Sequence, residues 1–225
     1  MGNLCIIPAR GGSKRIHRKN IKDFLGKPII AYSITTAIES KLFDKVMVST
    51  DDEEIAEIAR QYGAEVPFFR SKEASNDFAI LNDVLEEVIS SYEKIGQAFD
   101  NSCILFATSP LVTKNSLQKG LDLLTTKNFD SVRPVLKFSY PIQRAFRLTD
   151  GKVEMMQPEN YRKRSQDLES AYHDAGQFYW ISKSKSLLDT NKGAFVIDEM
   201  EAQDIDELSD WQMAELKYQI LHKQQ

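Results

Sequence analysis

Short apolar runs alternate with segments of helical periodicity up to about residue 138. The apolar runs predict strands at Leu4–Ile7, Lys45–Ser49, Glu65–Phe69, Ser102–Ala107 and Ser131–Lys137. Between them, apolar side chains recur with the helical period, as they do from Ile55 to Tyr62 and from Leu81 to Tyr92. This alternation predicts an α/β fold, a three-layer αβα sandwich in which helices cover both faces of a mainly parallel, Rossmann-like sheet.

The alternation of strand and helix patterns ends in the second part of the chain. Two apolar segments, Ala145–Leu148 and Lys152–Met156, flank an Asp-Gly turn and predict a hairpin. A polar stretch follows, and then the pattern predicts strands at Gly176–Ile181 and Ala194–Ile197. The terminal helix has its apolar stripe at Trp211, Ala214, Tyr218 and Leu221. We expect one domain over residues 1–225, with residues 140–175 inserted as a hairpin arm that is either a lid or a contact for a second subunit.

Composition excludes some classes of partner. The chain has 225 residues, with 29 Lys and Arg against 33 Asp and Glu, and its net charge of −4 argues against bulk binding to nucleic acid. No apolar run reaches the length that spans a membrane, and the first predicted strand starts at Leu4, which leaves no room for a signal peptide. We therefore expect a cytoplasmic protein without a membrane partner. Cys5 and Cys103 lie inside apolar runs and are expected to be buried.

The loop after the first predicted strand, residues 8–20, concentrates positive charge. It holds five Arg or Lys residues in a chain that is negative overall. Gly11 and Gly12 lack side chains, so backbone N–H groups can approach an anion closely. The loop matches neither of the common glycine-rich phosphate motifs, and a solvated basic turn is the alternative. Its position at a strand end, where ligands bind in open α/β sheets, favours phosphate.

This loop makes the sequence recognisable. Residues 8–15 followed by 18–20 resemble the signature of the cytidylyltransferases that activate sialic acid and related nonulosonic acids. The resemblance continues through residues 26–29, 48–52 and 62–66 and spans nearly the whole chain. It implies a sheet of the nucleotide-diphospho-sugar transferase type and a first loop that holds the triphosphate of CTP. Nucleotide binding in this loop then falls on Ala9, Arg10, Gly11, Gly12, Ser13, Lys19 and Asn20.

Three further segments match the family at strand ends. The resemblance implies base recognition by Arg70, Asp77 and Ala79, because an arginine can donate to the cytosine carbonyl; the alternative is a loop arginine and a helix cap at Asn76 or Asp77. It implies a nucleotide contact at Thr108. Phe106 stands where relatives carry Gln, and Ser109 is either functional or a helix cap. The segment from Thr50 to Glu53 fits a capping box better than a metal site.

Asp204 and Asp206 are the expected metal ligands. Carboxylates two residues apart in an extended segment share one side of the chain, and Mg²⁺ is commonly held by one or two carboxylates together with phosphate oxygens. The acidic run around them is otherwise typical of a solvated surface. The family has a metal-binding Asp-Ile-Asp pair in this position, which implies that both residues hold Mg²⁺.

Sugar choice is expected in the second half of the chain. Residues 140–145 and 164–180 resemble the pseudaminic acid branch of the family. A carboxylate-bearing sugar needs a cationic partner, and the candidates for the sugar site are Gln143, Arg144, Arg164 and Tyr179. These residues could instead pack a subunit interface. Because members of the family are dimers whose arms complete neighbouring sites, the resemblance implies a homodimer.

The resemblance implies transfer of CMP from CTP to pseudaminic acid, a nine-carbon acidic sugar, with release of pyrophosphate. Arg10, Lys19, Asp204 and Asp206 are the expected catalytic residues, and no general base can be assigned. Two alternatives stay open. The sugar could be sialic acid or 3-deoxy-octulosonic acid, or the protein could be a nucleotide-binding regulator without catalysis.

Overall fold

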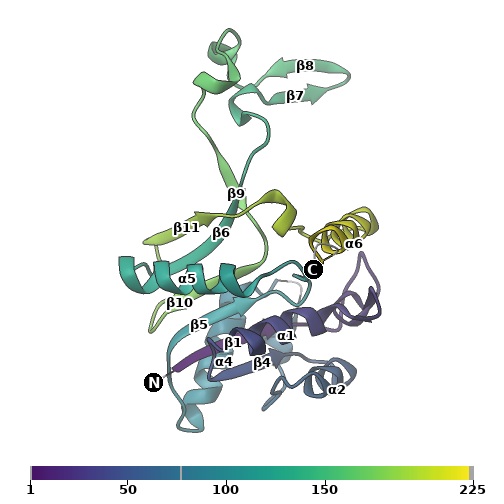
Figure 1. The fold of residues 1–225 in the computed structure, drawn as a ribbon, viewed down its shortest axis with the longest axis vertical. Coiled ribbons are helices and arrows are strands. Elements are labelled where there is room, and N and C mark those ends of the chain that lie inside the picture. Colours follow the sequence, from purple (N-terminus) through teal and green to yellow (C-terminus); the bar gives the residue numbers. More distant parts are fainter. Residues whose placement is uncertain (1, 77, 223–225) are drawn as a thin grey trace.

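A seven-stranded sheet forms the centre of the computed structural model, which describes residues 2–76 and 78–222 (Figure 1). Its path runs in the order β11-β6-β10-β5-β1-β4, and β9 pairs with β6. The strands are β1 (Gly2–Pro8), β4 (Lys45–Ser49), β5 (Phe99–Leu105), β6 (Ser131–Lys137), β9 (Tyr172–Asp174), β10 (Phe178–Ser182) and β11 (Lys192–Val196).

Parallel pairing dominates the half of the sheet that contains β1. This strand pairs in parallel with both β4 and β5, and β11 is parallel to β6. Strand β10 lies between β5 and β6 and is antiparallel to both. The predicted α/β fold with a mainly parallel sheet is confirmed.

Helices pack on both faces of the sheet. The helices of the described residues are α1 (Ile29–Ser40), α2 (Glu53–Gln61), α3 (Lys72–Ser75), α4 (Leu81–Lys94), α5 (Lys114–Lys127) and α6 (Leu208–His222), of which α1, α2, α4 and α5 contribute to the cores on the two faces. Alternation along β1 builds two cores: Cys5 and Ile7 join the cluster with α1, α2 and α5, whereas Leu4 and Ile6 join the cluster with α4. Burial raises the pKa of the Cys5 thiol well above its ordinary value, consistent with the expected core position.

A third apolar cluster ties the C-terminal segment to the first loop. Trp211 of α6 packs with Ile16, Phe24 and Ile205, and the rings of Phe24 and Trp211 meet edge to face at 5.5 Å. Phe24 lies in the short strand pair β2 (Asp23–Phe24) and β3 (Lys27–Pro28). The apolar side chains predicted on one side of the terminal helix therefore pack in the cluster that brings Ile205 against Ile16.

Two sequence predictions need correction. The segment Glu65–Phe69 is no strand, since only Glu65 forms an isolated bridge with Met47. The cap of α2 is Asp52, whose side chain accepts from the backbone N–H of Ile55, while Thr50 accepts from Asp52. The segment from Thr50 to Glu53 still caps the helix as predicted, but the capping residue is Asp52 and not Thr50.

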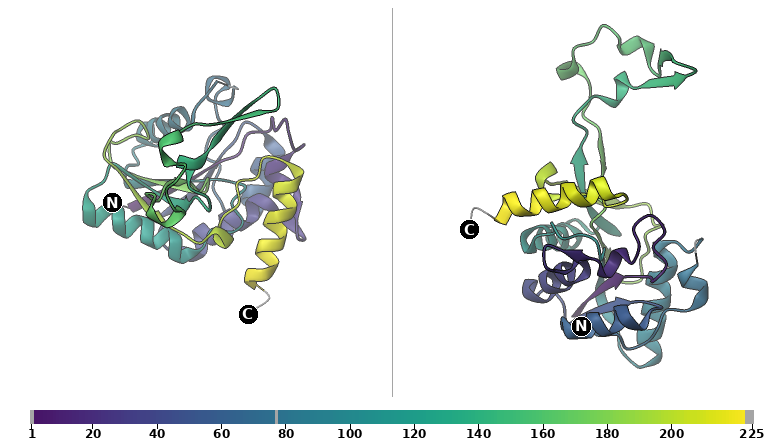
Figure 2. Two further views of the ribbon diagram at one scale, coloured as in Figure 1. Left: turned by 90° about the horizontal axis from the view of Figure 1, so that it is seen from above. Right: turned by 90° about the vertical axis from the view of Figure 1, so that its right-hand side faces the viewer.

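An arm leaves the sheet between β6 and β9 and extends away from the body (Figures 1 and 2). It carries the hairpin of β7 (Phe146–Thr149) and β8 (Lys152–Met155), and short 3-10 turns at Ile142–Arg144, Pro158–Asn160 and Ser165–Asp167. Further 3-10 turns lie in the body at Lys19–Ile21 and Glu199–Glu201. Within the described residues, the helices are all too short or too polar to cross a membrane.

Candidate active site

Two aspartates that follow β4 shape the first loop. The backbone N–H of Gly11 donates to the Asp51 carboxylate at 3.0 Å. A Cβ at Gly11 would lie 2.6 Å from Asp52 Oδ2, so this position has no room for a side chain. The loops after β1 and β4 lie at the carboxyl ends of neighbouring parallel strands, where ligands bind in sheets of this type.

Arg18 fastens the same loop to the start of α2. It has a left-handed backbone with φ of 52°, and its guanidinium contacts Asp52 at 2.5 and 2.9 Å as well as Glu54. The hydrogen bond from Arg18 lowers the pKa of Asp52 below its ordinary value. The basic loop is therefore held in one shape by acidic residues of the turn after β4.

The first loop and the C-terminal carboxylates meet in space. Lys19 Nζ donates to the carbonyl of Ile205 at 2.5 Å and lies 3.8 Å from Asp206. Arg15 forms a 2.6 Å ion pair with Asp206. Residues separated by more than 180 positions in the sequence are thus in direct contact.

The electrostatics of this contact suit a divalent cation. The protein around Asp204 removes part of its hydration and raises its pKa, and repulsion from Asp206 adds to the effect. Burial lowers the pKa of Lys19, opposed by attraction to the two aspartates. The described residues contain no group of three or more His, Cys, Asp or Glu side chains placed to hold a metal. Two carboxylates fit Mg²⁺ that also binds nucleotide phosphates.

A cavity of about 420 Å³ opens beside this contact. Its walls are Arg10, Ser13, Lys14, Arg15, Ile16, Lys19, Asn20 and Thr108. Thr108 comes from the loop after β5, so the structure brings it together with the basic loop as predicted from the sequence. Asn20 also donates its amide to the Arg10 carbonyl at 3.0 Å. Ala9 is buried and its N–H donates to Ser49, and a Cβ on Gly12 would point into open space.

A second cavity, of about 220 Å³, lies on the α4 side of the first strand. Arg10, Arg70 and Ala79 line it together with apolar residues of α4. Arg70 is buried and donates to the hydroxyl and the carbonyl of Ser49, and burial lowers its pKa to about 10. Ala79 N–H donates to the Asn76 side chain at 3.0 Å. Arg10 lines both cavities, so it lies where they meet.

Not every predicted nucleotide residue is placed. Asp77, predicted to contact the base, lies outside the described residues. The alternative cap at Asp77 also lies outside the described residues, and Asn76 is not the N-cap of α4, which is Ile80, although its side chain accepts from the N–H groups of Phe78 and Ala79. The alternative cap at Ser109 was wrong, because Thr113 caps α5. Ser109 is buried instead, with its hydroxyl 3.5 Å from the carbonyl of Gln177.

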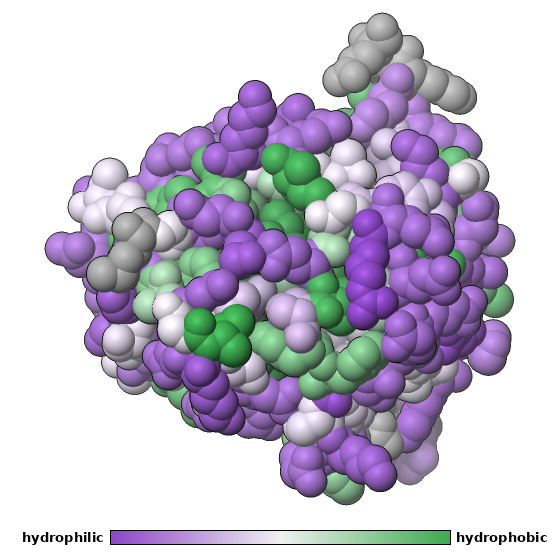
Figure 3. Space-filling model, turned by 90° about the horizontal axis from the view of Figure 1, so that it is seen from below, coloured by the Kyte–Doolittle hydropathy of each residue, from purple (hydrophilic) through white to green (hydrophobic). Residues whose placement is uncertain are grey.

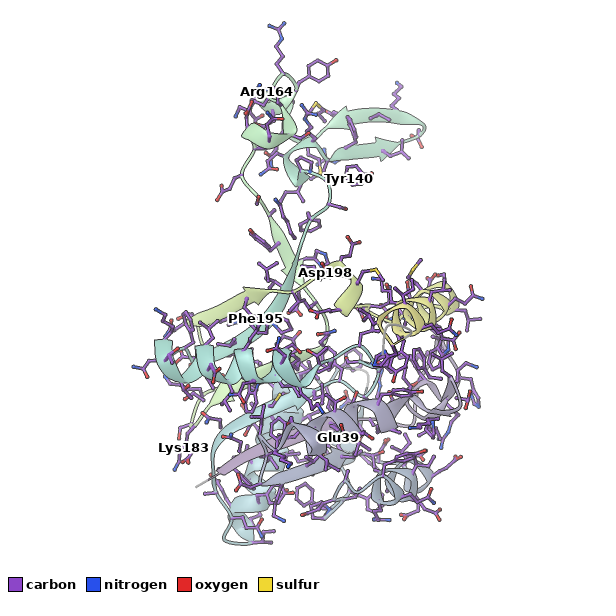
Figure 4. The ribbon with its side chains drawn as sticks, in the orientation of Figure 1. Glu39, Tyr140, Arg164, Lys183, Phe195 and Asp198 are labelled. Carbon is purple, nitrogen blue, oxygen red and sulfur yellow. The ribbon has the colours of Figure 1, made fainter. Side chains whose placement is uncertain are left out.

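Three of the four predicted sugar residues lie on the arm. Gln143 donates to the carbonyl of Glu169, Arg144 donates to the carbonyl of Lys163, and Arg164 pairs with Asp167 at 2.8 Å. These contacts hold the arm together. Figure 4 shows Arg164 near the far end of the arm, well away from the body, whose upper edge carries Asp198. Within one chain, the structure does not bring these three residues to the carboxylate pair.

Tyr179, the fourth, lies on the body. It is partly buried in β10, and its ring packs edge to face with Phe106 at 5.7 Å. Burial raises the pKa of Tyr179, and the nearby Asp174 and Asp204 add to this. Tyr179 therefore lies near Asp174 and Asp204, and its contact with the sugar stays a prediction.

The opposite end of the sheet contains another cavity, of about 410 Å³, between α4, the start of β5 and the end of β10. Lys183, labelled in Figure 4, lies at this end of the molecule. Seen from below, apolar side chains gather in the middle of the surface among polar ones (Figure 3). None of the residues predicted from the sequence to bind nucleotide or sugar lines this cavity.

Comparison with known proteins identifies the family. The family model of cytidylyltransferases matches residues 4–224. The chain belongs to the cytidylyltransferase family. This confirms the resemblance carried by the first loop, and it makes the chain a member of a family of nucleotidyltransferase enzymes.

Individual cytidylyltransferases match over the whole length. The chain is 44% identical to the pseudaminic acid cytidylyltransferase of Campylobacter jejuni subsp. jejuni serotype O:23/36 (strain 81-176), with 99% of both chains covered. It is 31% identical to the CMP-N,N'-diacetyllegionaminic acid synthase of Legionella pneumophila, with 94% of both covered. The solved structure of a CMP:2-keto-3-deoxy-manno-octonic acid synthetase complexed with CTP gives a TM-score of 0.71 at 16% identity, over 99% of this chain and 100% of that one. This last likeness shows a shared fold.

Sequence reasoning missed several residues of the site. Arg15 contacts Asp206, Asp51 and Asp52 fix the loop, and Arg133 and Asp174 lie beside Tyr179. Asp51 and Asp52 lie in the segment that the sequence assigned to helix capping, and the structure adds that they also fix the first loop. Arg133 and Asp174 had no comparable signal in the sequence.

Proposed function

We propose that this cytidylyltransferase transfers CMP from CTP to pseudaminic acid and releases pyrophosphate. Its similarity to the Campylobacter jejuni enzyme over nearly the full chain supports this substrate. The observation that carries the proposal is the contact between the basic loop, through Arg15 and Lys19, and the carboxylate of Asp206. CTP is a cytoplasmic nucleotide, so we place the reaction in the cytoplasm.

The residues that line the two cavities beside β1 suit the two ends of CTP. The smaller one, with Arg70 and Ala79 in its wall, would take the cytosine, and the larger one, with Ser13 and Lys19, would take the triphosphate. Arg10 lies between them, where the α-phosphate joins the nucleoside to the leaving pyrophosphate. A guanidinium in that position can neutralise charge that develops as pyrophosphate leaves.

In this reaction the anomeric hydroxyl of the sugar attacks the α-phosphorus and the bond to pyrophosphate breaks. Asp204 and Asp206 would hold Mg²⁺, which supplies charge neutralisation on the phosphate oxygens when bound. Lys19 is kept beside these carboxylates by its bond to the Ile205 carbonyl and would contact the same phosphates. Tyr179 and Phe106 form an aromatic wall next to the place where the sugar must lie.

The arm is proposed to join two copies of the chain. Residues 140–175 would form this arm within a single domain of residues 1–225. Both strands of its hairpin are almost fully exposed in one chain, with Leu148 71% and Phe146 60% exposed. An isolated two-stranded hairpin is at best marginally stable in water, so a partner surface is expected to cover it. A homodimer would also allow Arg144 and Arg164 to approach the neighbour's sugar.

The test is pyrophosphate release from CTP with a panel of acidic sugars. Pseudaminic acid, sialic acid and 3-deoxy-octulosonic acid are supplied separately, with a control that contains no sugar. We expect release with pseudaminic acid at a kcat/KM at least tenfold above that of the other two. Faster release with either of the other sugars would reassign the substrate, and no release with any sugar would contradict the proposed activity.

A further inference from the structure

Arg133 lies on the same face of the sheet as the proposed cytosine cavity. That cavity is walled by residues of α4, and Tyr179 also packs with the apolar cluster under α4. The guanidinium carbon of Arg133, in β6, lies 4.5 Å from the centre of the Tyr179 ring. One face of the sheet therefore runs from the base cavity past Tyr179 to Arg133.

This end of the face is open to solvent. Ala194 and Val196 of β11 pair in register with Arg133 and Val135, so their side chains share its face. Both are exposed, Val196 to 55%. Helix α5 packs against β6, β10 and β11 on the opposite side, where a Cβ added at Gly193, next to Ala194, would collide with Phe129. A ligand that extends from the nucleotide along the sheet can thus reach Arg133.

Asp174 connects Arg133 with the proposed metal ligands. Its carboxylate accepts from Arg133 Nη1 at 3.0 Å and from the backbone N–H of Gly176 at 2.9 Å. Gly176 has φ of +64°, and a Cβ there would lie 3.3 Å from Cγ of Asp204. Two hydrogen bonds therefore connect the guanidinium with Gly176, which lies next to Asp204. The ion pair and the stacking on Tyr179 hold the arginine in one orientation, which reduces the entropy lost when it binds a ligand.

The chemistry of the substrate requires a cation at this place. In a nonulosonic acid, the carboxylate is attached to the carbon that carries the attacking hydroxyl, so its partner must lie close to the α-phosphate and the metal ligands. Within the same chain, Arg144 and Arg164 make their contacts in the arm and do not reach this place. Lys217 donates to the carbonyls of Glu199 and Ala202, and Lys19 faces the phosphate cavity.

We infer that Arg133 binds the carboxylate of the sugar and that Asp174 positions it. Within the described part of the chain, Asp174 engages one terminal nitrogen of Arg133, so a second carboxylate can bind along the remaining edge of the planar group. The inference rests on the proposed function, because it assumes that the substrate is an acidic sugar with this arrangement of groups. Arg133, in the middle of β6, would then contribute to the selection of acidic sugars.

The experiment compares the free acid of pseudaminic acid with its methyl ester. Steady-state pyrophosphate release is measured for the wild type, Arg133→Met, Arg133→Lys and Arg133→Gln. For Arg133→Met we expect the KM for the free acid to rise about 10- to 100-fold, as for loss of a charge-assisted hydrogen bond, with the KM for CTP within about twofold. The wild type should prefer the acid over the ester, and Arg133→Met should lose that preference. Arg133→Lys should recover part of it.

A purely structural role would give a different result. Loss of fold would weaken acid and ester equally and would raise the KM for CTP as well, so that outcome, or an unchanged KM for the free acid, overturns the inference. Arg133→Gln, which keeps hydrogen bonding without charge, provides a second variant if Arg133→Met does not fold. Arg60→Met is the control, because Arg60 forms an exposed ion pair with Glu53 on α2.

The two hypotheses fail separately. If the wild type releases no pyrophosphate with pseudaminic acid, the proposed function is contradicted. If the wild type is active and Arg133→Met keeps both its KM and its preference for the acid, only the role of Arg133 is contradicted. Asp174→Asn adds a check, since loosening of Arg133 predicts a smaller rise in the same KM.

Discussion

At the scale of single residues, Arg10 has the most demanding position, between the proposed base and triphosphate cavities. It lines both of them, and its Nη1 lies 3.3 Å from the Asn76 carbonyl. The carbonyl of Arg10 itself is held by Asn20. If the two cavities bind CTP as proposed, a cation in this position would contact the part of the nucleotide where the bond is broken.

Replacing Arg10 with alanine is expected to reduce kcat/KM for pyrophosphate release by about 100- to 1,000-fold, the effect typical of losing one preorganised charge contact in a transition state. Arg60→Ala serves as the control and should stay within about twofold. Full turnover by Arg10→Ala would show that this residue does not act on the phosphates.

Gly11 and Gly12 form a matched pair for testing how the loop is packed. A Cβ at Gly11 would collide with the Asp52 carboxylate, whereas nothing lies within 4 Å of a Cβ at Gly12. We expect Gly11→Ala to lower the free energy of unfolding by about 1–3 kcal/mol, as overpacking does, and Gly12→Ala to leave it within about 0.5 kcal/mol. Urea unfolding of the two variants checks this. Equal stabilities would mean that Asp52 does not confine the loop.

The sequence was sufficient to predict Arg10 and Lys19 as candidates, because they lie in a basic loop at a strand end. Thr108 and the two C-terminal aspartates were predicted from the resemblance to the family. The sequence did not indicate a role for Arg133, because an arginine in a strand with alternating polar and apolar residues is equally typical of an ordinary solvent-exposed face. Only the register of β6 against β9 and β10 shows that it reaches Asp174 and Tyr179.

At the scale of elements, the turn between β4 and α2 is what gives the first loop its shape. Asp51 binds the N–H of Gly11, and Asp52 both caps α2 and accepts from Arg18. Since Arg18 lowers the pKa of Asp52, the stability from this pair is fully present above the ordinary aspartate pKa of 3.8. It is lost as the pH falls through the lowered pKa of the folded state.

Arg18→Met is therefore expected to be less stable than the wild type by about 1–2 kcal/mol at pH 7, as for loss of a partly buried charged pair. The difference should shrink as the pH falls below 3.8 and through the lowered pKa of Asp52 in the folded wild type, because Asp52 then becomes protonated in both proteins. Urea unfolding over this range measures it, with Arg60→Met as an exposed-pair control. A difference that is independent of pH would contradict the role of the Asp52 carboxylate.

The predictions of strands were wrong where the local pattern of apolar residues did not match the pairing of strands in the folded sheet. The apolar residues of Glu65–Phe69 look like a strand, yet the chain pairs with β4 only at Glu65 and then turns so that Arg70 reaches Ser49. Strand β9 was not predicted because it is three residues long and polar. Strand β9 forms because it is hydrogen-bonded to β6, and the local sequence of β9 does not indicate this pairing.

At the scale of the whole molecule, the arm is the feature that one chain does not explain. Its exposed apolar residues include Tyr140, Phe146, Leu148, Val153 and Tyr161. Binary pattern predicted the hairpin, because an Asp-Gly turn and alternating strands are local features. Its projection from the body follows from the path of the chain between β6 and β9, which no local pattern fixes.

Leu148→Asp is expected to convert a dimer into a monomer, because it places a charge on the surface proposed to be covered by the partner. Light scattering after size exclusion gives the mass. Leu188→Asp is the control, since Leu188 is 65% exposed and lies outside the arm. A wild-type protein that is monomeric at micromolar concentration, or a Leu148→Asp variant that remains dimeric, would contradict the role of the arm.

In the proposed mechanism, the basic loop and the C-terminal carboxylates act on one metal–nucleotide complex. Pyrophosphate release as a function of Mg²⁺ concentration tests this for the wild type, Asp204→Asn and the exposed control Glu207→Gln. We expect Asp204→Asn to need about tenfold more Mg²⁺ for half-maximal rate and to have a lower maximum, while Glu207→Gln follows the wild type. Superimposable Mg²⁺ curves for the wild type and Asp204→Asn would contradict it.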